Sequence, residues 1–248
     1  MPEFSGVVLD ARAFRDFTST RRAASANQSS SAGYTGQSDE CSRRSSGYVF
    51  PTKFNPTRSG TPGEIFSGRK LDKDVIRYVL PRDRTMGVIY TDGACSNNGY
   101  EGATAGWAFW HGCSRGSHPG SAETPLLCSG PLEAAPTIDL NSRNTNNRAE
   151  LCAVIAALRF KYWPSVFRIV VIATDSYYVV AGATVWAKTW IENGWETASG
   201  EPVKNQDLWE ELLREVKRYK NANAQVQFWR IPREWNEVAD AAAKRACR

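Results

Sequence analysis

The stretch GVIYTDGACSNNG, residues 87–99, runs from an apolar, β-branched segment directly into an aspartate, a glycine and a polar turn. The apolar part is typical of a buried strand, which we place at residues 86–94. Removing the carboxylate of Asp92 from water at the end of such a strand is unfavourable unless a partner compensates its charge. The stretch therefore raises the question of what that partner is.

A second buried strand ends in the same way. The segment FRIVVIATDS, residues 167–176, is almost continuously β-branched, which is typical of a strand covered on both faces. Asp175 follows this strand as Asp92 follows the first. Taken alone, Asp175 is equally well explained as the N-cap of a following helix. Two such endings favour a shared site, because α/β sheets usually build their sites at the carboxyl ends of strands.

The remaining elements complete an α/β domain. We expect a short amphipathic helix or turn at 74–80, a strand at 102–112, a loop with one or two short strands over 113–140, helices at 146–163, 176–194, 205–222 and 236–247, and a strand at 226–232. The first two strands form a hairpin. This order predicts a mixed five-stranded sheet flanked by helices.

The N-terminal part differs in composition. Residues 18–62 are dominated by Ser, Gly, Thr, Asn and Arg. Residues 1–85 hold 14 Lys/Arg and 9 Asp/Glu, whereas residues 86–248 hold 17 of each, so the first part carries the whole net charge of +5. We predict a basic, largely disordered tail at 1–73 and a catalytic domain at 74–248. Such a tail can hold a protein near nucleic acid, although similar linkers occur in proteins that bind none.

Several classes of protein are disfavoured. The chain has no run of about 18 apolar residues and no apolar secretory signal, so we expect neither membrane insertion nor secretion. Acidic residues near the N-terminus argue against a mitochondrial presequence, which leaves an intracellular protein, nuclear or cytoplasmic. Six cysteines without CxxC spacing suggest neither a zinc site nor a disulfide framework. We expect a monomer without an obligate protein partner.

Two further acids complete a constellation. Glu150 lies near the start of the helix at 146–163, where the helix dipole could explain it, and Asp240 lies in the terminal helix. Four acids that converged on one point would repel one another without a counter-charge. Mg²⁺ prefers carboxylate oxygens and would remove that repulsion. The sequence therefore predicts a metal site that includes Asp92.

The chain resembles type 1 ribonuclease H, the family with a DEDD carboxylate set, over residues 86–248. The resemblance is carried by the segments YTDGAC (90–95), TNNRAEL (145–151), ATDSYYV (173–179), GATVWAKTWIENGWETASGEPVKNQDLW (182–209) and NEVADAAAKRA (236–246). It implies the RNase H-like fold and an endonuclease that cuts the RNA strand of an RNA–DNA hybrid with two Mg²⁺ ions, with Mn²⁺ as a substitute. The metal ligands and catalytic residues would be Asp92, Glu150, Asp175 and Asp240, with Asp92 bridging both ions.

The resemblance also implies residues that bind the hybrid. Asn98, Asn146 and Asn147 would reach its minor groove, and Glu150 would also accept from a ribose 2′-hydroxyl. The positions that would contact the DNA strand are Arg143, Thr145 and Asn205 at a phosphate and Trp190 along the channel. Turn chemistry would explain the asparagines otherwise, and solvent exposure would explain the arginine.

One departure from the family concerns an auxiliary histidine. The segment RIPREWNEVAD, residues 230–240, is shorter than in the family and has Arg233 and Glu234 near the histidine position. The two histidines of the chain, His111 and His118, lie elsewhere. We therefore predict a eukaryotic, fungal-like member without this histidine and with a lower rate. The alternative is a catalytically weak or inactive hybrid-binding module, but retention of all four acids favours catalysis. A domain descended from a retroelement polyprotein would show the same resemblance.

Overall fold

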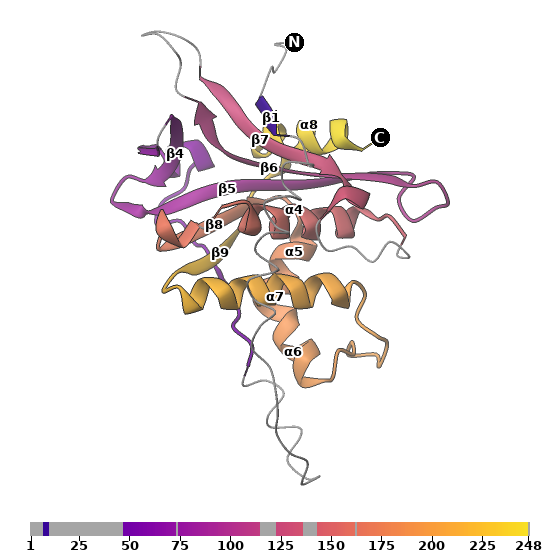
Figure 1. Ribbon diagram of the computed structural model, residues 1–248. Coiled ribbons are helices and arrows are strands. Elements are labelled where there is room, and N and C mark those ends of the chain that lie inside the picture. Colours follow the sequence, from indigo (N-terminus) through magenta and orange to yellow (C-terminus); the bar gives the residue numbers. More distant parts are fainter. Residues whose placement is uncertain are drawn as a thin grey trace, which may run out of the picture.

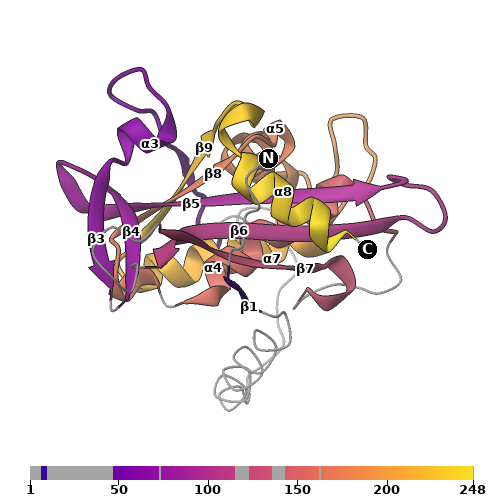
Figure 2. The same ribbon diagram turned by 90° about the horizontal axis from the view of Figure 1, so that it is seen from above.

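A single mixed sheet with helices on both faces forms the molecule (Figure 1, Figure 2). The computed structural model describes residues 7–9, 47–72, 74–114, 123–135, 143–161 and 163–247. In these residues the sheet has nine strands. The α/β fold class is confirmed, and the sheet is wider than predicted.

Five strands correspond to the predicted sheet. They are β5 (Asp83–Ser96), β6 (Thr104–Ser114), β7 (Thr124–Pro131), β8 (Ile169–Thr174) and β9 (Gln225–Arg230). The strands β5, β6 and β7 pair antiparallel, whereas β8 lies parallel to both β5 and β9. The carboxyl ends of β5, β8 and β9 therefore point the same way.

Helices cover both faces of this sheet (Figure 1). On one side lie α4 (Asn146–Phe160), α5 (Tyr177–Ala181), α6 (Ala187–Glu192) and α7 (Gln206–Asn221), and on the other lies α8 (Glu237–Ala246). The helix predicted at 176–194 is present as α5 and α6, joined by a π-helical turn at Gly182–Trp186. No helix in the described ranges is both long enough and apolar enough to cross a membrane.

Residues 75–80 form a strand, so the helix or turn predicted at 74–80 is wrong. This strand, β4 (Val75–Leu80), pairs antiparallel with β3 (Gly68–Asp72), β5 and β6. Its apolar positions fit a helical spacing, but they are mainly β-branched or aromatic, which suits a pleated sheet. A helix of so few residues would also be marginal in isolation, whereas strands on both sides satisfy the backbone of β4.

The segment before β4 belongs to the sheet. It contains β2 (Thr52–Lys53), which pairs parallel with β9, and the short helix α3 (Pro62–Ile65). Phe54 and Phe66 are buried against Trp229 in a second core, on the face that also carries α8. The predicted boundary between residues 73 and 74 is therefore wrong, because it falls inside the β3–β4 hairpin.

The rest of the predicted tail is described only in part. Residues 7–9 form β1 (Val7–Leu9), which pairs parallel with β7. Residues 1–6 and 10–46 lie outside the described residues, so their predicted disorder stays a prediction.

Candidate active site

Asp92 and Asp175 lie together because β5 and β8 run parallel. The register pairs Tyr90 with Ala173, so the two aspartates follow at equal distance along neighbouring strands. Asp175 comes directly after β8, as predicted. Asp92 is not at the end of its strand, because β5 continues alongside β6 to Ser96. It lies instead where the pairing between β5 and β8 ends.

Gly93 allows the start of α4 to approach β5. A Cβ atom at residue 93 would lie 2.2 Å from the backbone nitrogen of Glu150 and 2.4 Å from the backbone carbonyl carbon of Ala149. Any other residue would push α4 away from the sheet. Glu150 is the fifth residue of α4, and this close approach brings its carboxylate to the two aspartates.

The three carboxylates form a compact cluster. One oxygen atom from each of Asp92, Glu150 and Asp175 lies within 4.8 Å of the other two. Asp92 is 2% exposed and Glu150 is 5% exposed. Within the described residues, Asp92 Oδ2 and Glu150 Oε2 are buried without a hydrogen-bond partner. Buried acceptor oxygens of this kind fit a hard divalent cation, which binds carboxylates and supplies the missing partner.

Burial and like charges raise the pKa of the buried carboxylates. Burial, followed by the charges of Asp175 and Asp240, raises the pKa of Asp92 to about 8. Burial also raises the pKa of Glu150 well above its usual value, and Asp92 and Asp175 add to the effect. Ionising the cluster at neutral pH is therefore unfavourable for this chain alone. A bound cation would reverse that preference.

Asp240 lies at the margin of the cluster, and basic side chains compensate its charge. Its Oδ1 accepts a hydrogen bond from Arg233 Nη2 at 2.6 Å, and its Oδ2 lies 2.6 Å from Lys244 Nζ. Burial alone would raise the pKa of Asp240, but hydrogen bonds from Lys244 and Arg233 hold it below its usual value. The structure thus brings three of the predicted acids together and places the fourth beside them.

Asn236 holds the start of α8 against the two aspartate-bearing strands. Its buried side-chain Nδ2 donates to the main-chain oxygen of Thr91 at 3.0 Å and to Asp175 Oδ1 at 3.1 Å. Apart from the position of an asparagine before the last helix, no local pattern predicts this role, because both acceptors are distant along the chain.

No described histidine is available at this site. His111 is buried in β6, where its ring lies 4.8 Å from the ring of Phe160 and its Nδ1 is hydrogen-bonded to Arg77. Burial lowers the pKa of His111 well below its usual value. Glu234 is exposed on the turn before α8, and His118 lies outside the described residues. Among the described residues, the position expected for an auxiliary histidine is occupied by the Arg233 turn.

Several residues predicted to bind nucleic acid meet at the start of α4. Asn98, which is exposed, accepts a hydrogen bond from the main-chain nitrogen of Asn146 at 2.9 Å. Asn146 Nδ2 in turn lies 3.4 Å from Glu150 Oε1. Thr145 caps α4, and Asn147 is exposed. These contacts connect the predicted minor-groove residues to the carboxylates.

Arg148, which the sequence interpretation missed, joins the start of α4 to the start of α7. This buried side chain binds both carboxylate oxygens of Asp207, at 2.8 and 3.0 Å, and donates to Asn205 Oδ1 at 3.4 Å. Asn205 also donates to the hydroxyl of Tyr178 at 3.1 Å. The role of Arg148 depends on partners almost 60 residues away, which no local pattern reveals.

Trp190, predicted to lie along the path of the DNA strand, belongs to a group of aromatic side chains near α6 and α7. Trp209 is fully buried, and Trp190 is partly buried, with its ring 5.4 Å from that of Trp209 and 5.8 Å from that of Trp186. Trp186 and Trp195 are also partly buried. Trp190 therefore packs on the core and leaves part of its side chain exposed.

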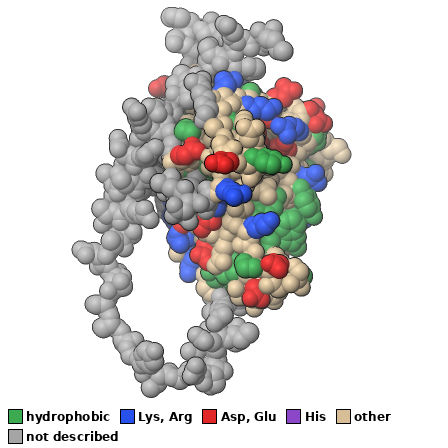
Figure 3. Space-filling model, turned by 90° about the vertical axis from the view of Figure 1, so that its right-hand side faces the viewer, with side chains coloured by type: hydrophobic (Ala, Val, Ile, Leu, Met, Phe, Trp, Pro, Cys, Tyr) green, Lys and Arg blue, Asp and Glu red, His purple; other side chains and the backbone are tan. Residues whose placement is uncertain are grey.

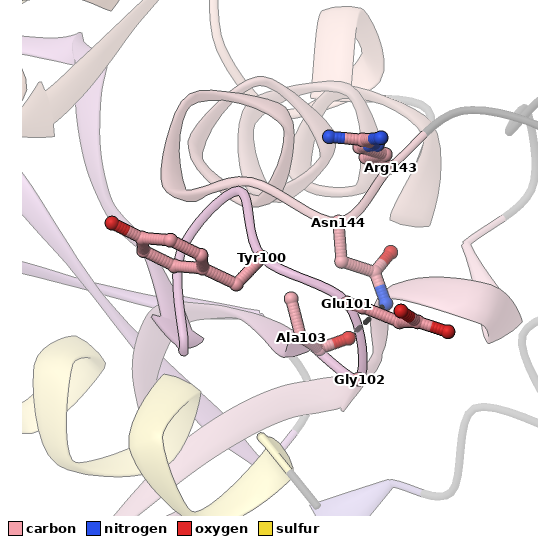
Figure 4. Close-up of a pocket in the computed structure, with 6 residues that line it drawn as sticks. All are labelled: Tyr100, Glu101, Gly102, Ala103, Arg143 and Asn144. Carbon is pink, nitrogen blue, oxygen red and sulfur yellow. Dashed lines mark hydrogen bonds between the residues drawn. The ribbon is translucent and has the colours of Figure 1, made fainter.

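A cavity of about 250 Å³ lies between the β5–β6 turn and the segment that leads into α4 (Figure 4). Its lining residues are Tyr100, Glu101, Gly102, Ala103, Arg143 and Asn144. Asn144 Nδ2 donates to the main-chain oxygen of Ala103 at 2.9 Å and so joins the two segments. Tyr100 and Arg143 lie on opposite sides of the cavity, and both are exposed.

Positive and negative side chains are interspersed on the face shown in Figure 3. This mixture agrees with the equal numbers of basic and acidic residues over 86–248. Attraction of a nucleic acid to this face would depend on individual basic groups, because the net charge of the domain supplies no general attraction.

Comparison with known proteins identifies the family. The RNase H family model matches residues 84–248, which is more than half of the chain. A ribonuclease H of Treponema pallidum subsp. pallidum is 40% identical over 169 residues, covering 64% of this chain and 89% of that protein. A ribonuclease H of Hyphomonas neptunium is 35% identical over 163 residues, covering 66% and 93%. The chain therefore belongs to the RNase H family, whose members hydrolyse the RNA of RNA–DNA hybrids with divalent metal ions.

Solved structures show a weaker likeness. LC9-RNase H1, a type 1 RNase H with the type 2 active-site motif, aligns with a TM-score of 0.44 and 29% identity, covering 66% of this chain and 72% of that one. The RNase H domain of PFV aligns with a TM-score of 0.45 and 22% identity, covering 64% and 93%. The family assignment rests on the sequence matches.

Proposed function

We propose that the protein is an endonuclease that hydrolyses the RNA strand of RNA–DNA hybrids with two Mg²⁺ ions. The proposed ligands of these ions are Asp92, Glu150, Asp175 and Asp240. The observation that carries the proposal is the cluster of three carboxylates with two buried, unpartnered oxygens. Family membership supplies the reaction, and this cluster supplies a place where hard cations would be bound.

The roles of the four acids follow from their surroundings. Asp92 would be the ligand shared by the ions, because it clusters with Glu150 and Asp175 and the charge of Asp240 also acts on it. Asn236 orients Asp175, and Arg233 orients Asp240. When bound, divalent ions activate a water molecule and stabilise the departing oxygen of the cleaved bond.

Recognition of the RNA strand would involve the start of α4. Asn98, Asn146 and Glu150 form a chain of contacts that leads from the surface to the carboxylates. Amide and carboxylate groups can exchange hydrogen bonds with a ribose 2′-hydroxyl, which DNA lacks. We assign these three residues, with Asn147, to the minor groove of the hybrid.

The DNA strand would be held further along the same surface. Thr145 caps α4, and Arg148 connects that helix to Asn205. Arg143 is exposed two residues before Thr145, and a phosphate held there would meet one guanidinium and the neutral donors of Thr145 and Asn205. Trp190 would line the path of the same strand through its partly exposed ring.

The test is cleavage of a labelled RNA–DNA hybrid beside matched RNA–RNA and DNA–DNA duplexes, in Mg²⁺, in Mn²⁺ and in EDTA. Asp92→Asn tests the cluster, and Glu201→Gln, an exposed carboxylate on a loop, is the matched control. We expect only the hybrid to be cut, only with a divalent metal, and only by the unmutated protein and the control variant. A protein that binds the hybrid but leaves it intact would be a binding module and would contradict the proposal.

A further inference from the structure

Tyr177 and Arg230 form an exposed pair beside the third carboxylate. Arg230 is the last residue of β9 and is the register partner of Thr174, which directly precedes Asp175. Tyr177 begins α5, two residues after Asp175. The guanidinium carbon of Arg230 lies 5.2 Å from the centre of the Tyr177 ring. The pair therefore lies at the same edge of the sheet as the carboxylates.

Stability of the fold does not explain this pair. Tyr177 is 56% exposed, and the neighbouring Val185 is 52% exposed. The Tyr177 ring meets Trp186 edge to face, with centres 5.7 Å apart, so its orientation is defined by the packing of the π-helical turn. An exposed cation–π pair contributes little to folding. An oriented aromatic ring with an adjacent guanidinium is, however, well suited to a nucleic acid.

The order of the strands gives the pair its place relative to the proposed hybrid surface. Neighbouring strands β5, β8 and β9 carry Asp92, Asp175 and Arg230 at their carboxyl-end side. Asn98 follows β5 and contacts the start of α4. The carboxylates therefore separate the minor-groove asparagines from the Tyr177–Arg230 pair. A strand that crosses the carboxylates from the asparagine side would continue over the pair.

The charges on this flank are complementary to a phosphodiester backbone. Arg230 is exposed, and Arg233 on the following turn is 67% exposed while it also binds Asp240. Arg233 has its carboxylate partner, whereas Arg230 contacts the neutral ring of Tyr177 and forms no ion pair with another described residue. The guanidinium of Arg230 thus keeps its charge available for an anion.

We propose that Tyr177 and Arg230 form a subsite for the RNA strand of the hybrid, on the side of the cleaved bond away from the asparagines. The guanidinium binds a phosphate oxygen, and the ring packs on the sugar or base of the same nucleotide. This inference rests on the proposed function and deepens it, since it names residues that bind substrate without touching the reacting atoms.

The test uses hybrids in which the place of cleavage is fixed. The cleaved strand carries a central block of ribonucleotides within DNA and is paired with complementary DNA. Three forms are compared: one with flanks on both sides of the block, one without the 5′ flank and one without the 3′ flank. The kcat and KM of the full chain are measured in Mg²⁺ for the unmutated protein, Tyr177→Ala, Tyr177→Phe, Arg230→Gln and Leu71→Ala. Leu71 is an exposed apolar control on β3.

On the fully flanked hybrid, we expect Tyr177→Ala and Arg230→Gln each to raise KM about 5- to 10-fold and to leave kcat within about twofold. Tyr177→Phe and Leu71→Ala should keep the KM of the unmutated protein. One of the two shortened hybrids lacks the nucleotide that Tyr177 and Arg230 would bind. On that hybrid the unmutated protein loses the contact as well, so its KM should equal the KM of the variants. A purely structural role would not depend on which flank is removed.

The inference is overturned if both variants keep the unmutated KM on the fully flanked hybrid, or if their defect persists on both shortened hybrids. Thermal unfolding checks that each variant is folded. If the unmutated protein cuts no hybrid at all, the proposed function fails first. The subsite is then decided by the Kd of the same hybrids in EDTA, where equal affinity of the variants and the unmutated protein overturns it.

Discussion

A group of buried carboxylates lies at each end of helix α4, and the two groups differ in whether basic side chains compensate their negative charge. At its start, Glu150 faces Asp92 and Asp175, and two of the buried oxygens have no partner among the described residues. At its end, Arg159 Nε donates to Glu215 at 2.8 Å. Both groups lie between α4 and another element, but only the second contains a guanidinium.

The second group is an extended ion-pair network between α4 and α7. Arg218 also donates to Glu215, at 2.6 Å, and Glu211 pairs with both Arg159 and Arg214. The chain thus supplies basic partners where a buried carboxylate serves only the fold. Among the described residues no basic side chain pairs with Asp92 or Glu150, which agrees with the proposed binding of cations there.

The largest expected effect concerns catalysis. Asp92→Asn should lower kcat on the order of 10³-fold or more, which corresponds to roughly 4 kcal/mol, because it removes the carboxylate shared by both proposed ions. The same change should leave the protein folded, since asparagine has nearly the same shape and places no charge at this buried position. Single-turnover cleavage of a hybrid measures the rate, and retention of more than a tenth of the activity would contradict the assignment.

In the ion-pair network we expect a substitution to lower stability and to leave the rate of cleavage almost unchanged. Glu215→Ala leaves Arg159 and Arg218 without this buried partner and should lower the free energy of unfolding by about 3 kcal/mol. The rate of hybrid cleavage by the folded fraction should change little. Urea unfolding measures the loss, and Glu201→Gln, which alters an exposed carboxylate, provides the reference. A large loss of kcat with unchanged stability would remove the distinction between the two groups.

A change of pH should separate the two groups in the metal-free protein. Asp92 has a pKa of about 8 in the folded state and 3.8 as its usual value. Between these values the folded state keeps a proton that the unfolded chain has released, so its free energy of unfolding falls as the pH rises. We expect a loss on the order of 2 kcal/mol from pH 6 to pH 8 in EDTA, since each pH unit below that pKa contributes at most about 1.4 kcal/mol.

Urea unfolding at both pH values measures this loss. Asp92→Asn should remove most of it, and saturating Mg²⁺ should oppose it by binding the ionised carboxylates of the folded state. An equal loss in the unmutated protein and in Asp92→Asn would show that other groups cause it.

The smallest effect is expected at Asp240. This residue lies beside the carboxylate cluster but, like Glu215, has basic partners. Arg233→Gln removes one of its two basic partners and should lower kcat about 10-fold by letting the carboxylate move. Because Arg233 is largely exposed, the free energy of unfolding should change by less than about 1 kcal/mol. Lys244→Gln, which removes the other partner, is the matched comparison. A loss confined to stability would show that Arg233 serves only the fold.

Local pattern sufficed for the part of the fold that carries the site. Apolar, β-branched runs located β5 and β8, and the aspartates that follow or interrupt them marked one edge of the sheet. The parallel register and the absent side chain of Gly93 then bring Glu150 to that edge. Residue types and element order are thus enough to propose the cluster, because its members lie on well-defined elements.

Long-range contacts explain the errors. The segment containing Phe54 and Phe66 has few apolar residues, but each packs on Trp229, about 170 residues away, so its composition concealed its role. Residues 74–80 have a spacing that suits a helix, but the segment forms the strand β4 because it pairs with strands on both sides. Arg148 and Asn236 likewise act through partners that no window of sequence contains.

The short strand β2 has a consequence for solubility. It covers the outer edge of β9, and Phe54 continues the contact by donating from its main-chain nitrogen to Phe228 at 2.8 Å. A protein shortened to residue 84, where the family match begins, would leave this edge and the aromatic ring of Trp229 uncovered. Open strand edges are templates for pairing between molecules. Protection of β9 against self-association is therefore a contribution of the residues that precede the family domain.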